Sequence, residues 1–269
     1  MDAPFTYYGG KARLARRLVA LMPRHRTYIE PFFGSGAVLF AKPPVLHEVV
    51  NDLDGAIVTF FRVLRERPED LAAVCRLSPY ARQEYEACGV LDAGDELEQA
   101  RRFWVRVNQS FAKTGNKRTG WSVTTARSQS APASVRSRIG RFEACAERLA
   151  RVQIECCDAP ELVERLAGAD SLVYCDPPYV GTTRTSTGDY RVEADEMAHR
   201  RLAEVLRASP ATVIVSGYAS PLYEELFEGW WSASYDTWTT AGNARGAARR
   251  PRSERVWANQ ALDEGRLAL

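Results

Sequence analysis

The segment Asp176-Pro177-Pro178-Tyr179 directly follows an apolar run at 171–175 that predicts a buried strand. Each proline fixes its own φ angle and keeps the residue before it out of the helical region, so Asp176 and Pro177 are both held extended. The Asp176 carboxylate and the Pro177 carbonyl then become two fixed acceptors at the carboxyl end of a strand, where open α/β sheets bind ligands. Two such acceptors beside an aromatic ring suit a flat group that carries an exocyclic NH₂. For this segment alone, a stiff turn that ends the strand is the competing interpretation.

A glycine loop, Phe33-Gly34-Ser35-Gly36, follows a short predicted strand at Thr27–Glu30 and precedes an apolar run that opens a helix. A second strand is predicted at His47–Val50, and Asn51-Asp52 comes directly after it. This order of strand, glycine turn, helix, strand and acid is typical of a nucleotide-binding βαβ unit. A dinucleotide fingerprint GxGxxG needs glycine where this chain has Leu39, so a nicotinamide cofactor is disfavoured.

The elements that position these residues follow an α/β pattern at both ends of the chain and a helical pattern in its middle. Further strands are expected at Val152–Cys156, Ala211–Val215 and Arg255–Ala261, and helices at Lys11–Met22, Gly55–Arg67, Phe142–Arg151, Pro160–Ala167 and Asp195–Ala208. Residues 241–253 are small and basic and are expected to be mobile. We therefore predict one α/β unit made of residues 1–54 and 152–269, and a mostly helical insert at residues 55–151.

The composition limits the class of protein. The chain has 269 residues and a net charge of +2. No run approaches the roughly 18 uninterrupted apolar residues of a membrane span, and the first residues lack the pattern of a signal peptide, so we expect a cytoplasmic protein with no membrane partner. The six cysteines form no CxxC pair and the three histidines are scattered, so we expect no metal site.

The predicted insert carries an excess of positive charge. Residues 55–151 contain 17 basic and 11 acidic side chains, and the stretch from Arg101 to Phe142 contains ten Lys or Arg and no Asp or Glu. Such a segment is typical of a surface that faces phosphates; an arginine-rich composition would account for the arginines but not for the missing acids. Within it, Glu96–Phe111 predicts an amphipathic helix whose polar side holds Arg101, Arg102, Arg106 and Asn108.

Taken together, these motifs make the chain resemble the DNA adenine methyltransferases of the Dam-like alpha class, whose catalytic signature is Asp-Pro-Pro-Tyr. Tyr7-Tyr8-Gly9-Gly10-Lys11 looks like the family's N-terminal motif, and Glu30–Gly36 looks like its cofactor loop. Asp52 and Asp158 match acids that follow the second and third strands. The resemblance implies a Rossmann-like methyltransferase sheet that binds S-adenosylmethionine, formed by residues 1–54 and 152–269. It also makes 55–151 the target-recognition insert.

The resemblance also implies roles for individual residues. The cofactor site would comprise Tyr7, Gly9, Gly10, Lys11, Glu30, Pro31, Phe32, Gly34, Ser35, Gly36, Asp52, Asp158 and Asp176. Asp52 is expected to accept the ribose hydroxyls, Asp158 the adenine amino group of the cofactor, and Glu30 to face its ammonium group. The catalytic residues would be Asp176, Pro177, Pro178 and Tyr179. Candidate contacts to double-stranded DNA are Asn108, Gln109, Lys113, Asn116, Lys117, Arg118, Thr182, Thr183 and Arg184.

The expected reaction is transfer of the sulfonium methyl group to the exocyclic N6 of an adenine that has been extruded from duplex DNA and stacked on Tyr179. Asp176 and the Pro177 carbonyl would accept hydrogen bonds from the amino group and stabilise the positive charge that develops on it. Two alternatives remain open from the sequence. One is methylation of cytosine N4, RNA or a protein amide, and the other is a DNA-binding protein that only senses S-adenosylmethionine. By resemblance, a monomer is expected.

Overall fold

The computed structural model describes residues 1–7, 11–12, 14–111, 120–123, 130–178, 195–238 and 251–263, with the backbone alone at 236–238 and 251–252. A seven-stranded sheet in the order β3-β2-β1-β4-β5-β7-β6 forms its centre. The strands are β1 Thr27–Glu30, β2 His47–Asn51, β3 Val152–Glu155, β4 Ser171–Cys175, β5 Thr212–Tyr218, β6 Trp231–Trp238 and β7 Pro251–Ala258. The first five are parallel, whereas β7 runs antiparallel to both β5 and β6.

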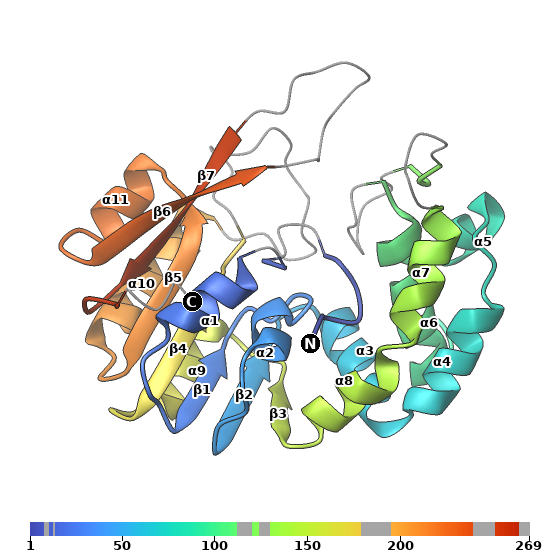
Figure 1. Cartoon of the computed structure of the whole chain (residues 1–269), viewed down its shortest axis with the longest axis horizontal. Helices are drawn as coiled ribbons and strands as arrows, with labels where there is room; N and C mark the ends of the chain where they lie inside the picture. Colours follow the sequence, from blue (N-terminus) through green and yellow to red (C-terminus); the bar gives the residue numbers. More distant parts are fainter. Residues whose placement is uncertain are drawn as a thin grey trace.

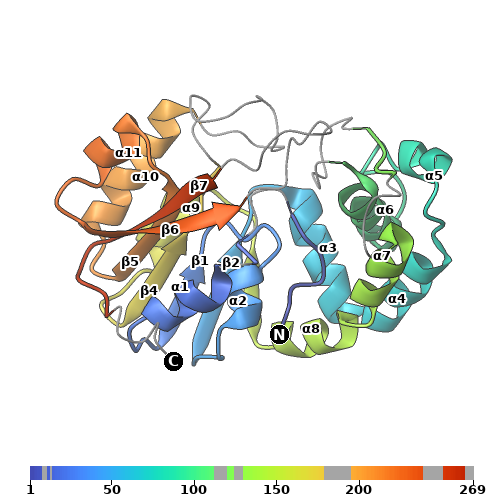
Figure 2. The same cartoon turned by 45° about the horizontal axis from the view of Figure 1, so that its top comes forward.

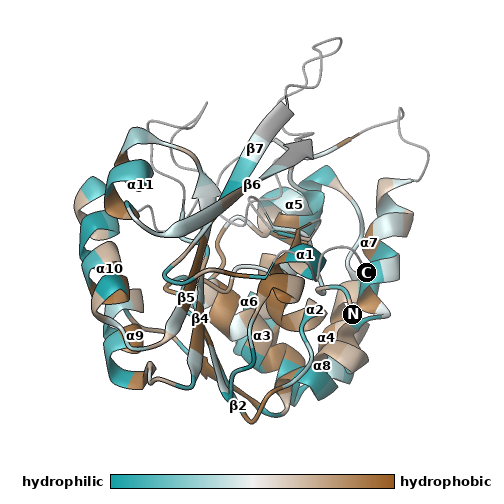
Figure 3. Ribbon diagram, turned by 60° about the vertical axis from the view of Figure 1, so that its left-hand side comes forward, coloured by the Kyte–Doolittle hydropathy of each residue, from teal (hydrophilic) through white to brown (hydrophobic). Residues whose placement is uncertain are grey.

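Helices cover both faces of this sheet (Figure 1). On one face lie α1 Ala15–Leu21, α2 Ala37–Ala41 and α3 Gly55–Glu66, and on the other lie α9 Ala159–Leu166, α10 Glu196–Ala208 and α11 Pro221–Leu226. Figure 3 shows the hydrophobic strands β4 and β5 between these two sets of helices. A parallel sheet must be covered on both faces, which is why its strands read as continuous apolar runs.

Alternation along each strand separates two hydrophobic cores. On β4, Leu172 and Tyr174 belong to the core beneath α1, α2 and α3, whereas Val173 and Cys175 belong to the core beneath α9, α10 and α11. Successive strand side chains point to opposite faces, so residues two apart share a core. This alternation also fixes which face receives the polar side chains at the strand ends.

The chain between β2 and β3 forms the helical insert. It contains α3, α4 Pro68–Leu77, α5 Arg82–Ala87, α6 Glu96–Gln109, α7 Ala131–Ile139 and α8 Phe142–Leu149. Figures 1 and 2 show α4 to α7 at one end of the molecule and the sheet at the other, with α3 and α8 between them.

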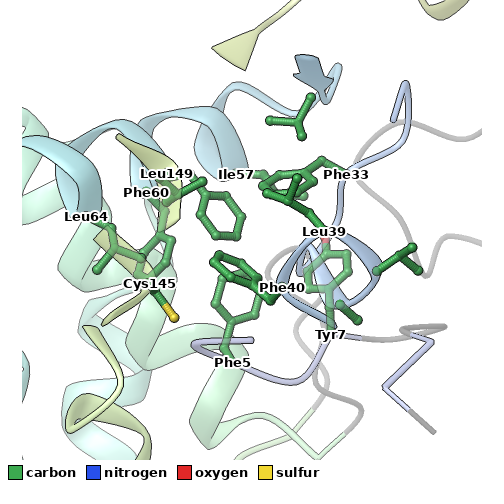
Figure 4. Close-up of a cluster of buried hydrophobic side chains, with 14 of the residues drawn as sticks. Phe5, Tyr7, Phe33, Leu39, Phe40, Ile57, Phe60, Leu64, Cys145 and Leu149 are labelled. Carbon is green, nitrogen blue, oxygen red and sulfur yellow. The ribbon is translucent and has the colours of Figure 1, made fainter. Parts of the chain in front are cut away.

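Aromatic side chains join the insert to the rest of the protein. Phe60 on α3 packs edge-on against Phe5 of the N-terminal segment, with ring centroids 5.1 Å apart, and also contacts Phe103 on α6. Figure 4 shows Phe5, Phe33, Phe40 and Phe60 in one cluster. The helix α3 therefore belongs to the hydrophobic core of the sheet as much as to the insert, and the predicted boundary at 54/55 stays a prediction.

The predicted α/β fold with a Rossmann-like methyltransferase sheet is confirmed, and most of the expected elements lie within a few residues of their predicted bounds. The strand β6 and the helix α11 were missed, and the individual helices α4, α5 and α7 lie in the insert, which was expected only as mostly helical. The expected mobility of 241–253 is wrong for 251–253, which begin β7 and pair with β6; residues 241–250 lie outside the described residues. The strand predicted at Arg255–Ala261 is thus β7, which begins earlier, at Pro251: its buried residues Val256, Trp257 and Ala258 gave the signal, whereas its first residues are held by pairing with β6.

Among the described residues, no helix is long and apolar enough to cross a membrane. The six cysteines are all free, and Cys75, Cys88, Cys145 and Cys175 are buried. These four are small apolar residues of the hydrophobic cores.

Candidate active site

A cavity of about 240 Å³ lies where the parallel strands end. Residues from the ends of β1, β2 and β4 line it, together with the start of α9 and one side of α10. Of the predicted site residues, the lining includes Tyr7, Lys11, Glu30, Pro31, Phe32, Gly34, Ser35, Asp52, Asp158, Asp176, Pro177 and Pro178. The tertiary structure thus brings residues from four separate motifs to one cavity at the edge where α/β folds bind ligands.

Asp176 follows β4 directly, and two groups hold its carboxylate in place. The Lys11 Nζ lies 2.6 Å from Oδ1, and the Ser216 Oγ donates a hydrogen bond to the same oxygen at 3.1 Å. No donor in the described part of the chain contacts Oδ2. Burial raises the pKa of Asp176 to about 6, against the lowering effect of the Lys11 ammonium. The carboxylate is therefore ionised at neutral pH and presents one oxygen without a partner among the described residues.

The position of Lys11 comes from the start of α1 and from a second acid. Its carbonyl accepts hydrogen bonds from the amides of Leu14 and Ala15, which fixes the backbone there. Its ammonium lies 3.0 Å from Oε1 of Glu254 on β7, and both side chains are buried. Burial alone would lower the pKa of Lys11, but the carboxylates of Asp176 and Glu254 outweigh it and raise the pKa well above the ordinary value. Sequence analysis missed Glu254 because it lies in a segment with no strong strand signal.

Glu30 is the last residue of β1 and lies on the face of the sheet that α1, α2 and α3 cover. Its Oε2 accepts a hydrogen bond of 2.9 Å from the Tyr28 hydroxyl, and its side chain is buried. Burial raises the pKa of Glu30 to about 8, despite that hydrogen bond. Glu30 is therefore mostly protonated at neutral pH until a positive group is placed beside it.

The glycine loop positions Asp52 through its backbone. The amide of Gly34 donates to Oδ2 of Asp52 at 2.8 Å, and the amide of Asp54 donates to Oδ1 at 2.9 Å. Gly34 has a φ of 51° and lines the cavity, and a Cβ there would come only within 3.8 Å of Tyr7, so it would fill cavity space. Burial raises the pKa of Asp52 to about 7, against the effect of both amides.

Gly36 has a different role from the predicted one. It does not line the cavity. Its φ is 70°, and a Cβ there would lie 2.5 Å from the ring of Phe33 and 2.9 Å from that of Phe40. Glycine is needed at this position for the left-handed backbone and for the packing of two aromatic rings at the start of α2, rather than for close approach of a ligand.

Asn51 ties the ends of three strands together, a role that sequence analysis missed. Its Nδ2 donates to the carbonyls of Pro31 and Cys157 at 2.9 and 3.0 Å, and its Oδ1 accepts from the Cys157 amide at 2.9 Å. These residues follow β1 and β3 on either side of β2. The buried amide thus holds the loops that carry the cavity walls.

Asp158 and residues of α10 also line the cavity. Asp158 precedes α9 and forms an ion pair of 2.8 Å with Arg201 of α10. His199 and Leu202 of α10 also line the cavity, as does Leu53, whose surface is 49% exposed. Leu53 gives this part of the cavity an apolar wall, and none of these α10 residues was predicted.

Asn108 and Gln109 are not placed to read DNA bases, contrary to the sequence-based expectation. Both are buried on α6. The Asn108 side chain donates to the Trp104 carbonyl and accepts from Arg138, and the Gln109 side chain bonds to Pro79 and Trp121. Their amides are used inside the insert, because α6 packs against neighbours on more sides than an amphipathic surface helix does.

The arginines of α6 are also occupied. Arg101 forms ion pairs with Glu84 and Glu98, and Arg102 pairs with Glu98. Arg106 is buried, with its guanidinium 3.9 Å from the centre of the Tyr85 ring. The acids that pair with Arg101 and Arg102 thus come from α5 and from the first turn of α6 itself, and these three arginine side chains stabilise the insert instead of facing phosphates.

The remaining predicted site residues lie outside the described residues: Gly9, Gly10, Lys113, Asn116, Lys117, Arg118, Tyr179, Thr182, Thr183 and Arg184. Within the described ranges, no group of three His, Cys, Asp or Glu side chains is placed to hold a metal ion.

Comparison with known proteins identifies the class. The family model of the D12 class N6 adenine-specific DNA methyltransferases matches residues 7–240. The chain is 28% identical over 246 residues to a type II methyltransferase, M1.LlaDCHI, of Lactococcus lactis subsp. cremoris, with 84% of each chain covered. It is 24% identical to a DNA adenine methylase of Vibrio cholerae serotype O1, covering 82% of this chain and 83% of that one. It is also 24% identical to a DNA N-6-adenine-methyltransferase of Escherichia phage P1, covering 83% of this chain and 30% of that one.

The chain belongs to the D12 class N6 adenine-specific DNA methyltransferases. The resemblance drawn from its motifs is confirmed, and so is the predicted reaction class, methylation of adenine N6 in DNA. This family decides against methylation of cytosine, RNA or a protein amide, since its target is adenine in DNA, and membership of a methyltransferase family also decides against a protein that only senses S-adenosylmethionine.

Proposed function

We propose that the cavity binds S-adenosylmethionine and that Asp176 and the Pro177 carbonyl accept the amino group of an adenine extruded from duplex DNA. The observation that carries this proposal is the Asp176 carboxylate at the edge of the cavity, whose contacts with the described residues are made through Oδ1. An amino group that donates to Oδ2 needs no rearrangement of Lys11 or Ser216. The acceptor is thus oriented before the substrate binds. Such preorganisation of polar groups is the main source of electrostatic catalysis.

The residues present fit S-adenosylmethionine. Five acids line the cavity, Glu30, Asp52, Asp54, Asp158 and Asp176, and two cations, Lys11 and Arg201. This excess of acid suits a ligand with a sulfonium and an ammonium group. In this arrangement Asp52 holds the ribose hydroxyls, Asp158 the adenine amino group, and Glu30 the ammonium, which favours the ionised form of Glu30. When bound, S-adenosylmethionine supplies an electrophilic methyl group attached to a positively charged sulfur.

The chemistry of the chain itself is orientation and charge stabilisation. The exocyclic nitrogen of adenine is a weak nucleophile, because its lone pair is delocalised into the ring. Hydrogen bonds to Asp176 Oδ2 and to the Pro177 carbonyl favour the pyramidal form and stabilise the positive charge that develops on the nitrogen. Tyr179 stacks on the extruded base, an interaction worth about 1–3 kcal/mol.

DNA contact is proposed for residues of two polar segments of the sequence. Lys113, Asn116, Lys117 and Arg118 follow α6, and Thr182, Thr183 and Arg184 follow the Asp-Pro-Pro-Tyr segment. Their support is the charge and polarity of both segments, since Lys and Arg supply phosphate contacts and Asn can pair with adenine. A cytoplasmic, monomeric enzyme stays a prediction.

Replacing Asp176 by Ala tests the proposal. Methyl transfer to duplex DNA should fall by at least about 100-fold, because the oriented acceptor is lost. DNA binding should persist. Transfer of labelled methyl groups and analysis of the methylated nucleoside measure the first effect, and a DNA mobility shift measures the second. Asp170→Ala, a change to an exposed acid at the opposite end of β4, is the matched control and should be as active as the wild type. Normal turnover by the Asp176 variant, or a product other than N6-methyladenine, would contradict the proposal.

A further inference from the structure

The Lys11 ammonium lies between two buried carboxylates, and only one of them has a proposed role. Lys11 Nζ is 2.6 Å from Oδ1 of Asp176 and 3.0 Å from Oε1 of Glu254. The exposed fractions of the Lys11 and Glu254 side chains are 4% and 5%. A second buried acid on an ammonium is costly to desolvate, so its presence calls for a reason beyond the pairing of Lys11 with Asp176.

The antiparallel strand β7 brings Glu254 to this position. Glu254 pairs with Tyr218 at the end of β5, and alternation places it on the same face as Val256 and Ala258. That face is also the one to which Tyr174 and Ser216 belong, and the Tyr174 hydroxyl and the Ser216 Oγ lie 2.9 Å apart. Since β7 runs opposite to its neighbours, its beginning meets the carboxyl ends of the parallel strands, where Asp176 lies.

We propose that Glu254 is a positioning residue for methyl transfer. It holds the Lys11 ammonium so that Lys11 and Ser216 both contact Oδ1 of Asp176, while Oδ2 stays available to the amino group of the target base. This inference rests on the proposed function of Asp176.

Two physical effects follow from this arrangement. First, an ammonium that pairs with a single carboxylate can move between the two oxygens of that carboxylate. A second acid, here Glu254, holds the ammonium on the side of one oxygen, Oδ1 of Asp176. Second, Lys11, Asp176 and Glu254 together carry one net negative charge when all are ionised, and this charge complements the positive charge that develops on the amino nitrogen. With Gln at position 254 the group becomes neutral.

The protonation of Asp176 also depends on the interaction with Lys11 and Glu254. Among the described residues, the polar and charged groups that face Asp176 include Lys11 from the N-terminal segment, Glu30 on β1, Tyr174 on β4, Ser216 on β5 and Glu254 on β7. Burial raises the pKa of Asp176 to about 6, Lys11 lowers it and Glu254 raises it. Activity that needs the carboxylate should fall as the pH drops through about 6. Removing the charge of Glu254 lowers the pKa of Asp176 and moves this acid limb to lower pH.

The experiment compares Glu254→Gln and Glu254→Asp with the wild type in single-turnover methylation of duplex DNA between pH 5 and 8. It is run at a temperature at which thermal unfolding shows each variant to be folded. We expect Glu254→Gln to reduce the rate at pH 7.5 by about tenfold and to shift the acid limb down by about 0.5 pH unit or more. The dissociation constant for S-adenosylmethionine should change by less than about twofold. Glu254→Asp keeps the charge, so its acid limb should stay at the wild-type pH and its rate should fall less.

The matched control is Glu224→Gln, which removes an exposed carboxylate that pairs with Arg255, the neighbour of Glu254 on β7. It should leave both the rate and the acid limb unchanged. The proposal is overturned if Glu254→Gln has the wild-type rate and limb, if its defect lies only in cofactor affinity, or if Glu254→Asp shifts the limb as far as Glu254→Gln does. A wild-type protein that does not methylate DNA, or an active Asp176→Ala variant, would instead refute the proposed function, so the two failures are distinguishable.

Discussion

At the scale of single residues, the site is a set of acids whose pKa values are raised by burial. Glu30, Asp52 and Asp176 have pKa values of about 8, 7 and 6. The residue types follow from the sequence, because each acid ends or follows a predicted strand. The pKa values follow from burial, which only the packing of helices over the strand ends determines. Polar groups arranged in this way are costly for stability and are typical of functional sites.

A substitution at Glu30 tests how much a buried acid of the site reduces the free energy of unfolding. A carboxyl with a folded pKa near 8 and an unfolded pKa of 4.5 favours folding at low pH, and this contribution is lost as the pH rises from about 4.5 through 8. Glu30→Gln is neutral at every pH and can still accept from the Tyr28 hydroxyl. We expect the ligand-free variant to match the wild type at pH 5 and to exceed its free energy of unfolding by about 1–3 kcal/mol at pH 9. Urea denaturation at both pH values measures this, and equal pH dependence in the two proteins would contradict it.

At the scale of elements, the site depends on how the strand ends are joined. The glycine loop, the residues after β2 and the start of α9 carry separate parts of the cavity, and Asn51 bonds to the first and the last of these connections. The sequence predicted the three strands but not their lateral connection, because an Asn before an Asp gives no signal of a partner 106 residues away.

Replacing Asn51 by Ala should affect stability and activity together. It leaves the Pro31 and Cys157 carbonyls without their donor, so we expect a loss of about 2–4 kcal/mol in the free energy of unfolding. The rate of methylation should fall as well, since the walls of the cavity are no longer tied. Asn259→Ala is the matched control, because Asn259 bonds to Ala211 and Val213 near the other end of β5. Denaturation and methylation assays on both variants measure these effects. The Asn259 variant should lose stability but keep the wild-type rate of methylation. Equal losses of rate in the two variants would refute the role of Asn51.

At the scale of the whole molecule, the insert and the sheet share one hydrophobic core. The cluster beneath α1, α2 and α3 continues through Phe60 and Phe103 to Phe142 on α8. An insert that shares its core with the sheet in this way keeps a fixed orientation relative to the cavity. Such rigidity suits an enzyme that must hold a base of a long duplex at one place.

Phe60→Ala should therefore destabilise the sheet and the insert in one step. The side chain is fully buried, and its removal leaves a cavity among aromatic rings, so we expect a loss of about 3–5 kcal/mol. Unfolding followed by circular dichroism and by tryptophan fluorescence should give a single coincident transition at lower denaturant. Leu77→Ala, at a side chain that is 83% exposed, should change stability by less than about 0.5 kcal/mol. Two separate transitions in the Phe60 variant would show that the insert folds independently.

The sequence by itself determined the parallel strands, the glycine loop, the acids after β2 and before α9, and the rigid Asp176-Pro177-Pro178 segment. These features are local, because strand periodicity and the restrictions of proline and glycine act over a few residues. Only the tertiary structure decided that Glu254 and Ser216 complete the surroundings of Asp176, that Gly36 serves packing, and that Asn108 and Gln109 are buried. Each of these depends on contacts between segments far apart in the chain: the antiparallel register of β7 on β5, the two rings against the start of α2, and the packing of α6 within the insert.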